Sequence, residues 1–256
     1  MAENKPLFEF NNLHVEVAGK DIVRGVSLKI FPGQIHAIMG PNGSGKSSLS
    51  HALMGHPDYR ISQGEVTLEG ENLLEMSADQ RSRAGLFLAF QYPLAIPGVS
   101  VANFMRAAVK AHRGKDAEMS DFRKLFLKEM AALSIDRSFA TRYLNDGFSG
   151  GEKKRVEILQ MSMLNPKMAL LDETDSGLDI DALKIVSDGI NRFHNDRNSI
   201  LLVTHYQRLL NYVKPQHVHV MMHGQLVKSG GPELALQLEE KGYDWIEQEL
   251  AKRVQV

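Results

Sequence analysis

The sequence predicts an α/β protein whose core sheet is preceded by an antiparallel β region and interrupted by an all-helical subdomain. Apolar and polar residues alternate over roughly the first 30 positions, which is typical of antiparallel strands. The runs Met168–Leu171 and Ser199–Val203 are almost wholly apolar, which favours parallel strands buried on both faces. Apolar residues recur at helical spacing between Val101 and Ser134. These patterns divide the chain into an α/β core of residues 1–92 and 152–256 and a helical subdomain of residues 93–151.

The composition is that of an ordinary folded protein. Of the 256 residues, 43% are hydrophobic and 24% are charged, so the chain can bury a full core. The net charge of -1 argues against a nonspecific nucleic-acid binder. No apolar run reaches the roughly 18 residues of a membrane-spanning helix, and the opening MAENKPLFEF has no signal pattern. The chain has no cysteine, which excludes disulfides and thiolate chemistry. We therefore expect a cytoplasmic protein that neither binds nucleic acid nor inserts directly into membranes.

The N-terminal part is predicted to contain short strands and one helix. The strand sequences LHVEV and VSLKI flank a turn at Ala18-Gly19. A buried strand at Gln34–Met39 then runs into a glycine-rich turn, and a helix follows over roughly Lys46–Met54. Gly55 stands where a helix-ending glycine is expected. Further short strands are expected at Glu65–Gly70 and Leu86–Phe90.

The insertion is predicted to contain helices because two sets of apolar residues recur at helical spacing. The first set comprises Phe104, Ala107, Ala108 and Ala111, and the second comprises Phe122, Leu125, Phe126 and Met130. Towards the C-terminus, a turn at His223-Gly224 separates two strand-like runs, and a helix that carries Trp245 closes the chain.

A phosphate-binding loop is predicted between the buried strand and the first helix. Residues 40–47 read GPNGSGKS and match the pattern GxxxxGK[ST]. Glycines allow successive backbone N–H groups to point at phosphate oxygens, and the helix N-terminus adds partial positive charge. We expect Lys46 to reach the β- and γ-phosphates and Ser47 to ligate Mg²⁺. The predicted nucleotide-binding residues are Gly40, Pro41, Asn42, Gly43, Ser44, Gly45, Lys46, Ser47 and Ser48.

Two acidic residues, Asp172 and Glu173, end the apolar strand that begins at Met168. Seen alone, they are equally consistent with the start of a solvated loop. Beside a phosphate-binding loop, burial of an acid needs a partner, and Mg²⁺ is the natural one. We expect Asp172 to hold Mg²⁺ through a water molecule, and Glu173 to position or deprotonate the attacking water.

Four further motifs follow in a fixed order. They are Gln91 after an apolar strand, the segment FSGGE at 148–152, the segment DSGLD at 175–179, and His205 at the end of another strand. Ser149 and Glu152 form a capping box, so a helix is expected to begin there with its N–H groups open to an anion. With the phosphate-binding loop, this ordered set resembles the ATP-binding cassette (ABC) family of P-loop NTPases over nearly the whole chain.

The resemblance implies an ATPase that uses ATP and Mg²⁺ and works as a head-to-tail pair, with two ATP molecules at the interface. It implies that one copy completes the site of the second copy through its signature residues, Ser149, Gly150, Gly151 and Glu152. The implied catalytic residues are Glu173, His205 and Gln91. The implied Mg²⁺ ligands are Ser47, Gln91 and Asp172, and Asp179 is expected to couple the two sites.

The details resemble one branch of the family, the ATPase subunits of the SUF iron–sulfur cluster assembly machinery. The signature reads FSGGEKKR, and Thr174 stands in DETDSGLD where proline is usual. This branch implies SufB- and SufD-like scaffold proteins as partners. Without cysteine, the chain cannot ligate a cluster through thiolates, so the cluster would sit on those partners. Val17 stands where transporters usually stack an aromatic residue on adenine, so weak base selectivity is expected.

Several alternatives stay open at this stage. The main one is the nucleotide-binding subunit of a membrane ABC transporter, because the catalytic motifs are the same. A nonhydrolysing regulatory subunit and a DNA-repair ATPase are less favoured. The segment Tyr92–Val99 is either a docking surface for a partner or ordinary core packing. His217, His219 and His223 alternate as in a metal site, but we favour a structural role because no further ligand is evident.

Overall fold

The computed structural model describes residues 5–114, 119–205 and 207–254. Its strands are β1 (Phe8–Val17), β2 (Lys20–Ile30), β3 (Ile35–Met39), β4 (Arg60–Leu68), β5 (Glu71–Asn72), β6 (Leu86–Ala89), β7 (Ile96–Ser100), β8 (Tyr143–Leu144), β9 (Met168–Asp172), β10 (Ser199–Val203), β11 (His217–Met222) and β12 (Gln225–Gly230). Its helices are α1 (Lys46–Met54), α2 (Ala78–Ala84), α3 (Val101–Arg113), α4 (Phe122–Ala132), the short 3₁₀ helix η1 (Arg137–Thr141), α5 (Gly150–Leu164), α6 (Ile180–Phe193), α7 (Pro232–Lys241) and α8 (Asp244–Val254).

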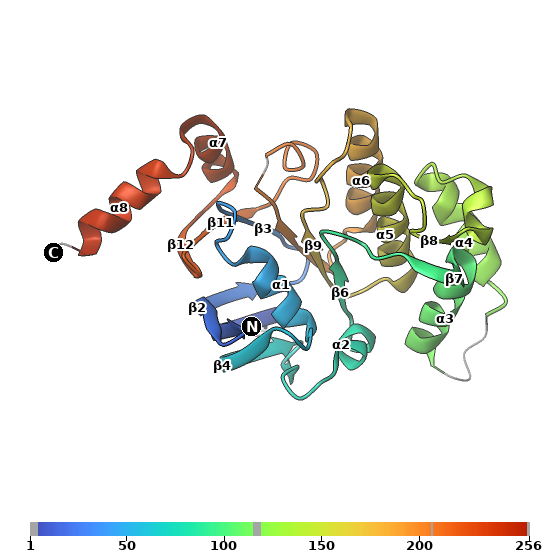
Figure 1. Cartoon of the computed structure of the whole chain (residues 1–256), viewed down its shortest axis with the longest axis horizontal. Helices are drawn as coiled ribbons and strands as arrows, with labels where there is room; N and C mark the ends of the chain where they lie inside the picture. Colours follow the sequence, from blue (N-terminus) through green and yellow to red (C-terminus); the bar gives the residue numbers. More distant parts are fainter. Residues whose placement is uncertain (1–4, 115–118, 206, 255–256) are drawn as a thin grey trace.

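Two sheets form the core, as the sequence predicts. The N-terminal strands make an antiparallel sheet in the order β2-β1-β4-β5, and the second sheet has the order β12-β11-β3-β10-β9-β6. In the second sheet only β12 is antiparallel to its neighbour. Strands β3, β6, β9 and β10 therefore all end at one edge of this sheet. Figure 1 shows α1 beside the antiparallel sheet and α5 and α6 on the other side of the central strands.

The central strands are buried on both faces. In β9, Met168 and Leu170 pack with α1 and the antiparallel sheet, whereas Ala169 and Leu171 pack with α5, α6 and the helical subdomain. Strands β6 and β10 divide their side chains between the same two clusters. Successive side chains of a strand point to opposite faces, so a strand between two apolar layers must be apolar throughout. This confirms the prediction of buried parallel strands.

Residues 93–151 are mainly helical, with one feature that the sequence reading lacked. Strands β7 and β8 form a two-stranded antiparallel sheet inside this segment, so it is not purely helical. Helix α4 packs through Phe122, Phe126 and Met130, three of its four expected apolar positions. Helix α3 buries Val101, Met105 and Val109 instead of its expected stripe. That stripe faces a groove described below.

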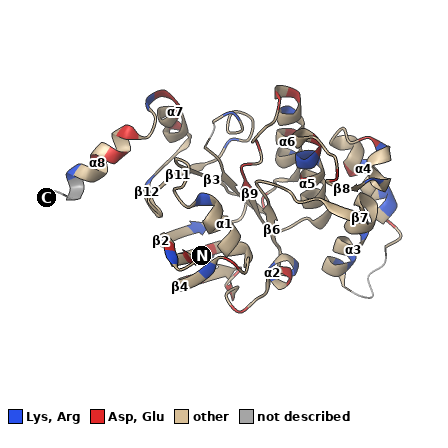
Figure 2. Ribbon diagram, viewed as in Figure 1, with Lys and Arg blue, Asp and Glu red and all other residues tan. Residues whose placement is uncertain are grey.

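Charged side chains lie on the outer helices and loops (Figure 2). Strands β3 and β10 carry no Lys, Arg, Asp or Glu, and helix α8, which extends from the rest of the chain beyond α7 (Figure 1), carries several. Within the described ranges, no helix is both long and apolar enough to cross a bilayer.

Three histidines gather where β3 and β11 run side by side. His36 Nδ1 lies 3.0 Å from His219 Nε2, and the ring of His217 is 4.5 Å from that of His36. His219 also contacts Ser229 at 2.8 Å, while His223 lies in the β11–β12 turn and pairs with Glu247 at 3.8 Å. In the described part of the chain, no group of three or more potential ligands is arranged to hold a metal ion. The contacts of His217 and His219 are those of packed core side chains.

This cluster makes stability depend on pH. Burial lowers the pKa of His36 from 6.5 to about 3 and that of His219 to about 4, and neighbouring histidines lower both further. Because the folded chain excludes protons that the unfolded chain binds, the stabilisation is complete above pH 6.5 and is lost as pH falls towards 4. We expect His36→Gln to reduce the loss of unfolding free energy between pH 7 and pH 5 by roughly 1–2 kcal/mol. Denaturant titrations at both pH values measure it, with exposed His223→Gln as the control; equal losses in wild type and His36→Gln would contradict it.

Candidate active site

The phosphate-binding loop joins β3 to α1, as predicted. A Cβ atom on Gly40 would lie 2.1 Å from the carbonyl oxygen of Met221, so only glycine fits between the loop and β11. Gly45 precedes α1 with φ 104°, in the left-handed region that glycine adopts at low cost. The first turn of α1 contains no acidic residue, so the positive end of this helix is not neutralised locally. The loop therefore offers free positive potential to an anion.

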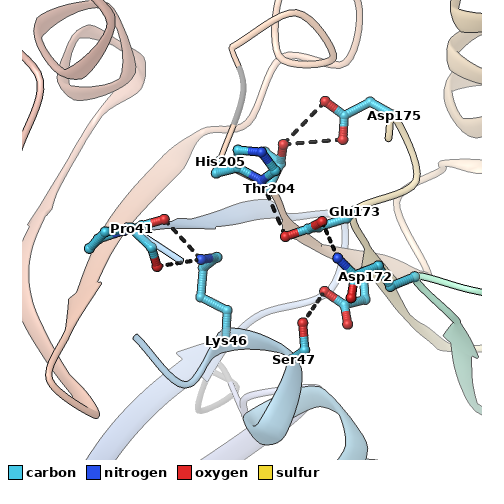
Figure 3. A network of polar contacts seen from close by, with 10 residues as sticks. Pro41, Lys46, Ser47, Asp172, Glu173, Asp175, Thr204 and His205 are labelled. Atoms are coloured by element: carbon cyan, nitrogen blue, oxygen red, sulfur yellow. Dashed lines mark hydrogen bonds and ion pairs between the residues drawn. The ribbon is translucent and has the colours of Figure 1, made fainter. Parts of the chain in front are cut away.

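Lys46 points back over the loop. Its ammonium donates hydrogen bonds to the carbonyl oxygens of Gly40 at 2.8 Å and Pro41 at 3.0 Å (Figure 3), and the residue is 4% exposed. Burial lowers the pKa of Lys46, while the nearby charges of Glu173 and Asp172 raise it. A partly desolvated cation interacts with a phosphate more strongly than an exposed one. The side chain is placed to hold phosphate oxygens.

Asp172 and Ser47 form the candidate magnesium site. Ser47 Oγ donates to Asp172 Oδ1 at 3.1 Å, while the buried Asp172 Oδ2 has no hydrogen-bond partner. Burial raises the pKa of Asp172 to about 6, and the neighbouring charge of Glu173 raises it further. Mg²⁺ prefers hard oxygen ligands, and a divalent cation offsets exactly this kind of buried negative charge. These donors fit Mg²⁺, and the solvated-loop alternative is wrong, because Asp172 is fully buried.

Glu173 is held between two partners. The Gln91 amide donates to its Oε2 atom, and His205 Nδ1 lies 3.2 Å from its Oε1 atom (Figure 3). Its backbone has φ 44°, a strained value for a residue with a side chain, and its N–H donates to the carbonyl of Val203 at 2.8 Å. Such strain costs roughly 1–3 kcal/mol and persists where the surroundings impose it, often at functional sites. The strain aims the carboxylate at the phosphate-binding loop.

Asp175 and Thr204 were not among the predicted site residues, although both lie beside Glu173. The Thr204 hydroxyl lies 3.2 Å from each carboxylate oxygen of Asp175, joining the end of β10 to the loop after β9 (Figure 3). Burial raises the pKa of Asp175, and its own backbone N–H and Thr204 lower it. Asp175 lies in the quoted DSGLD segment, so position was a usable signal, whereas nothing in the sequence pairs it with Thr204.

These groups surround a cavity of about 220 Å³. Its lining brings together loop residues with Gln91 and Glu173, which are up to 131 positions apart in the chain, namely Asn42, Gly43, Gly45, Lys46, Ser47, Ser48, Gln91 and Glu173. The lining contains phosphate-binding donors on one side and a carboxylate with an amide on the other. The arrangement can bind a phosphate chain and hold a water molecule next to its end.

The signature lies elsewhere on the surface. Ser149 caps α5: its Oγ accepts from the Glu152 N–H at 3.3 Å, and Glu152 Oε2 accepts from the Ser149 N–H at 2.7 Å, which confirms the capping box. Phe148 is buried beneath and lies 4.8 Å from Phe139, with the guanidinium of Arg142 above both rings. Ser149 and Gly150 are exposed, and in the described chain no signature residue lines the phosphate cavity.

Two other predicted positions have clear places in the fold. Asp179 is the N-cap of α6, where its carboxylate accepts from the Ala182 N–H at 2.7 Å. Val17 is half-buried at the end of β1, paired with Lys20 across the turn. The proposed roles of Asp179 in coupling and of Val17 in base contact stay predictions.

Comparison with known proteins decides the family. The family model described as "ABC transporter" matches residues 23–176. The chain belongs to this family. It is therefore an ABC-type ATPase, which uses ATP with Mg²⁺.

The chain also resembles individual proteins over most of its length. It is 57% identical to vegetative protein 296 of Bacillus subtilis strain 168, over 93% of this chain and 92% of that one. It is 51% identical to the probable ATP-dependent transporter ycf16 of Cyanophora paradoxa, over 98% and 99%. Among solved structures, the dimeric post-hydrolysis form of the ATP-binding cassette MJ0796 with ADP and Pi matches with a TM-score of 0.76 at 20% identity, covering 88% of this chain and 98% of that one. This last likeness supports the fold.

Lys46 and Glu173 should fail in different ways. Lys46→Ala removes charged hydrogen bonds worth roughly 1.5–3 kcal/mol each, so ATP should bind about 10- to 100-fold more weakly. Glu173→Gln removes the base but keeps the shape, so hydrolysis should fall at least about 100-fold while ATP affinity stays within a few-fold. Titration with a fluorescent ATP analogue and phosphate release measure the two effects. Glu240→Gln on α7 is the control, and unchanged hydrolysis in both active-site variants would point to a nonhydrolysing role.

Proposed function

We propose that two copies of this chain close head to tail around two ATP molecules, and that hydrolysis reopens them. The observation that carries this proposal is the separation of parts: the cavity contains donors for phosphate and a base, whereas the exposed N-terminus of α5 at Ser149 and Gly150 faces away from it. An exposed capped N-terminus offers N–H groups to an anion. A second copy is the natural source of that anion, because each copy's own loop binds its own nucleotide.

In this proposal, each residue of the cavity has one task. The loop and Lys46 bind the phosphate chain, while Asp172 and Ser47 would hold Mg²⁺, which neutralises the charge that develops on the transferred phosphoryl group. Glu173 orients the attacking water and accepts its proton. Gln91 and His205 hold the two oxygens of that carboxylate, and His205 also contacts the γ-phosphate. Asp179 couples the two sites of the pair.

ATP favours the closed pair because only that state adds signature contacts to the γ-phosphate. A ligand shifts a conformational equilibrium only through its different affinity for the two states. Loss of the γ-phosphate removes the difference, so the pair opens. The cycle thus turns ATP hydrolysis into relative movement of two subunits.

We propose that the moving subunits reshape a cytoplasmic iron–sulfur cluster scaffold of the SufB and SufD kind, which makes this chain an ATPase of the SufC type. Support comes from the segments FSGGEKKR and DETDSGLD and from the absence of cysteine, which leaves cluster ligation to a partner. The alternative is the motor of a membrane transporter, and the name of the Cyanophora paradoxa relative favours it. Affinity purification distinguishes the two: a cysteine-bearing scaffold recovered without membranes supports the first, and a membrane-embedded partner supports the second.

The surface proposed to carry the partner is an apolar groove between the core and the helical subdomain, which we call the Phe90 groove. Two adjoining cavities of about 310 and 270 Å³ share Phe90 and Phe104. The first is also lined by Leu94 and Ile96, which are 81% and 37% exposed, and the second by Ala108 and Ala111 of the α3 stripe. The alternative of ordinary core packing is wrong for these side chains. An apolar helix of the scaffold fits such a groove.

The proposed pair can be tested by crosslinking because the chain has no native cysteine. We expect one copy with Asn42→Cys and another with Gly150→Cys, both also carrying Glu173→Gln, to crosslink with a short bismaleimide when ATP and Mg²⁺ are added. Gel electrophoresis measures the crosslinked pair. Lys241→Cys on α7 replaces Gly150→Cys in the control and should give no product. Equal crosslinking with and without ATP, or none in the presence of the scaffold, would contradict the pair.

The docking surface has its own test. Leu94→Asp with Ile96→Asp places two charges in the Phe90 groove, so desolvation should weaken capture of the SufB- and SufD-type scaffold at least about 100-fold. ATP affinity should stay unchanged, because neither side chain lines the phosphate cavity. Pull-down and nucleotide titration measure the two. Leu236→Asp, at a 57% exposed leucine on α7, is the control, and undiminished capture by the double variant would refute this surface.

A further inference from the structure

A buried ion pair in α5 has no part in the cycle described above. Lys154 and Glu157 lie one turn apart with Nζ and Oε2 at 3.2 Å, and their side chains are 4% and 3% exposed. A buried ion pair contributes little net stability, because desolvation offsets the attraction between the charges. Its contacts with other groups therefore carry the information about its role.

Both charged groups bind the backbone of one residue, Phe90. Glu157 Oε1 accepts a hydrogen bond from the Phe90 N–H at 2.6 Å, and the Lys154 ammonium donates to the Phe90 carbonyl. Phe90 follows the last residue of β6, where its backbone groups no longer have a ladder to join. The pair thus replaces the sheet as the partner of this backbone.

The next residue along the chain is Gln91, whose amide holds the Glu173 carboxylate. The Phe90 carbonyl belongs to the same planar peptide unit as the Gln91 N–H, so fixing that carbonyl fixes the start of the Gln91 backbone. We propose that Lys154 and Glu157 are positioning residues that clamp the Phe90 backbone and thereby hold Gln91 against Glu173. The proposal rests on the role of Gln91 in the proposed function.

The clamp lies within reach of both the groove and the active site. Glu157 lines the Phe90 groove, so a partner seated there meets the clamp. Burial raises the pKa of Glu157 to about 7, against the opposing effects of Lys154 and the Phe90 N–H. The charge of Lys154 also lowers the pKa of Asp172, which gives the pair a second, electrostatic route to the site. A test must separate the two routes.

Two variants should respond in opposite ways. Lys154→Met with Glu157→Leu removes both charges and both Phe90 contacts while keeping side-chain volume, so the melting temperature should be unchanged or higher. Its basal kcat for ATP should fall about 10-fold at constant KM. Glu157→Gln keeps an oxygen for the Phe90 N–H but leaves Lys154 unpaired, so the melting temperature should fall while kcat stays within about 2-fold. A wild-type kcat in the double variant would overturn the clamp.

Gln91→Ala provides the decisive background. If the clamp acts only through Gln91, adding Lys154→Met and Glu157→Leu to Gln91→Ala should change kcat by less than about 2-fold. A further 10-fold loss would show action through Asp172 and overturn the proposal. If Gln91→Ala alone leaves kcat unchanged, the proposed role of Gln91 fails as well. If only the clamp variant is inert, the clamp fails and the proposed function stands.

A third variant covers failure of the double variant to fold. Glu157→Asp keeps the charge for Lys154 but is one methylene too short for the 2.6 Å contact with the Phe90 N–H. We expect it to lose kcat about 5-fold, with faster hydrogen exchange at the Phe90 amide, where Glu157→Gln retains both. Equal kcat and equal exchange in the two variants would overturn the clamp.

Discussion

The site depends on two carboxylates buried at the end of an apolar strand. Asp172 is 0% exposed and Glu173 is 6% exposed, so each must find compensation inside the protein. Ser47, Lys46, Gln91 and His205 supply hydrogen bonds and positive charge around them. The compensation is incomplete, since the pKa of Asp172 still rises to about 6 and its Oδ2 atom has no partner. A pocket with excess negative charge beside a cationic loop suits a metal and a phosphate together, and either alone less well.

Sheet topology explains why these groups meet. Val203 at the end of β10 is in register with both Asp172 on β9 and Ile38 on β3, and Ala89 on β6 is in register with Leu171. Parallel strands in register end at one edge, which is where ligands bind in open α/β sheets. The phosphate-binding loop, Gln91, Glu173 and His205 each follow one of these strands. Their chemistry is local, but their meeting is a property of the strand order β3-β10-β9-β6.

The sequence predicts what has a strong local pattern. The buried strands, the helix Lys46–Met54 and the capping box at Ser149 follow from apolar runs, glycine positions and spacing, and the structure has each of them. The face of α3 was harder, because a stripe of Phe104 and alanines reads as a core face whether it meets the core or a groove. The bonds from Lys154 and Glu157 to Phe90 could not be predicted, because a backbone partner has no identity that a sequence pattern can reveal.

The clamp also connects two surfaces that otherwise lie on different elements. Helix α5 begins at the signature and carries Lys154 and Glu157 in its first two turns. A helix behaves as a stiff rod over this distance, so the signature and the clamp move together. Gln91 is tied to that rod through Phe90, whose side chain lines the groove. A partner that tilts α5 must therefore displace Gln91 from Glu173 or carry the two along with it, and the same tilt moves Ser149 relative to the second copy. One hinge thus links occupancy of the groove, the catalytic carboxylate and closure of the pair.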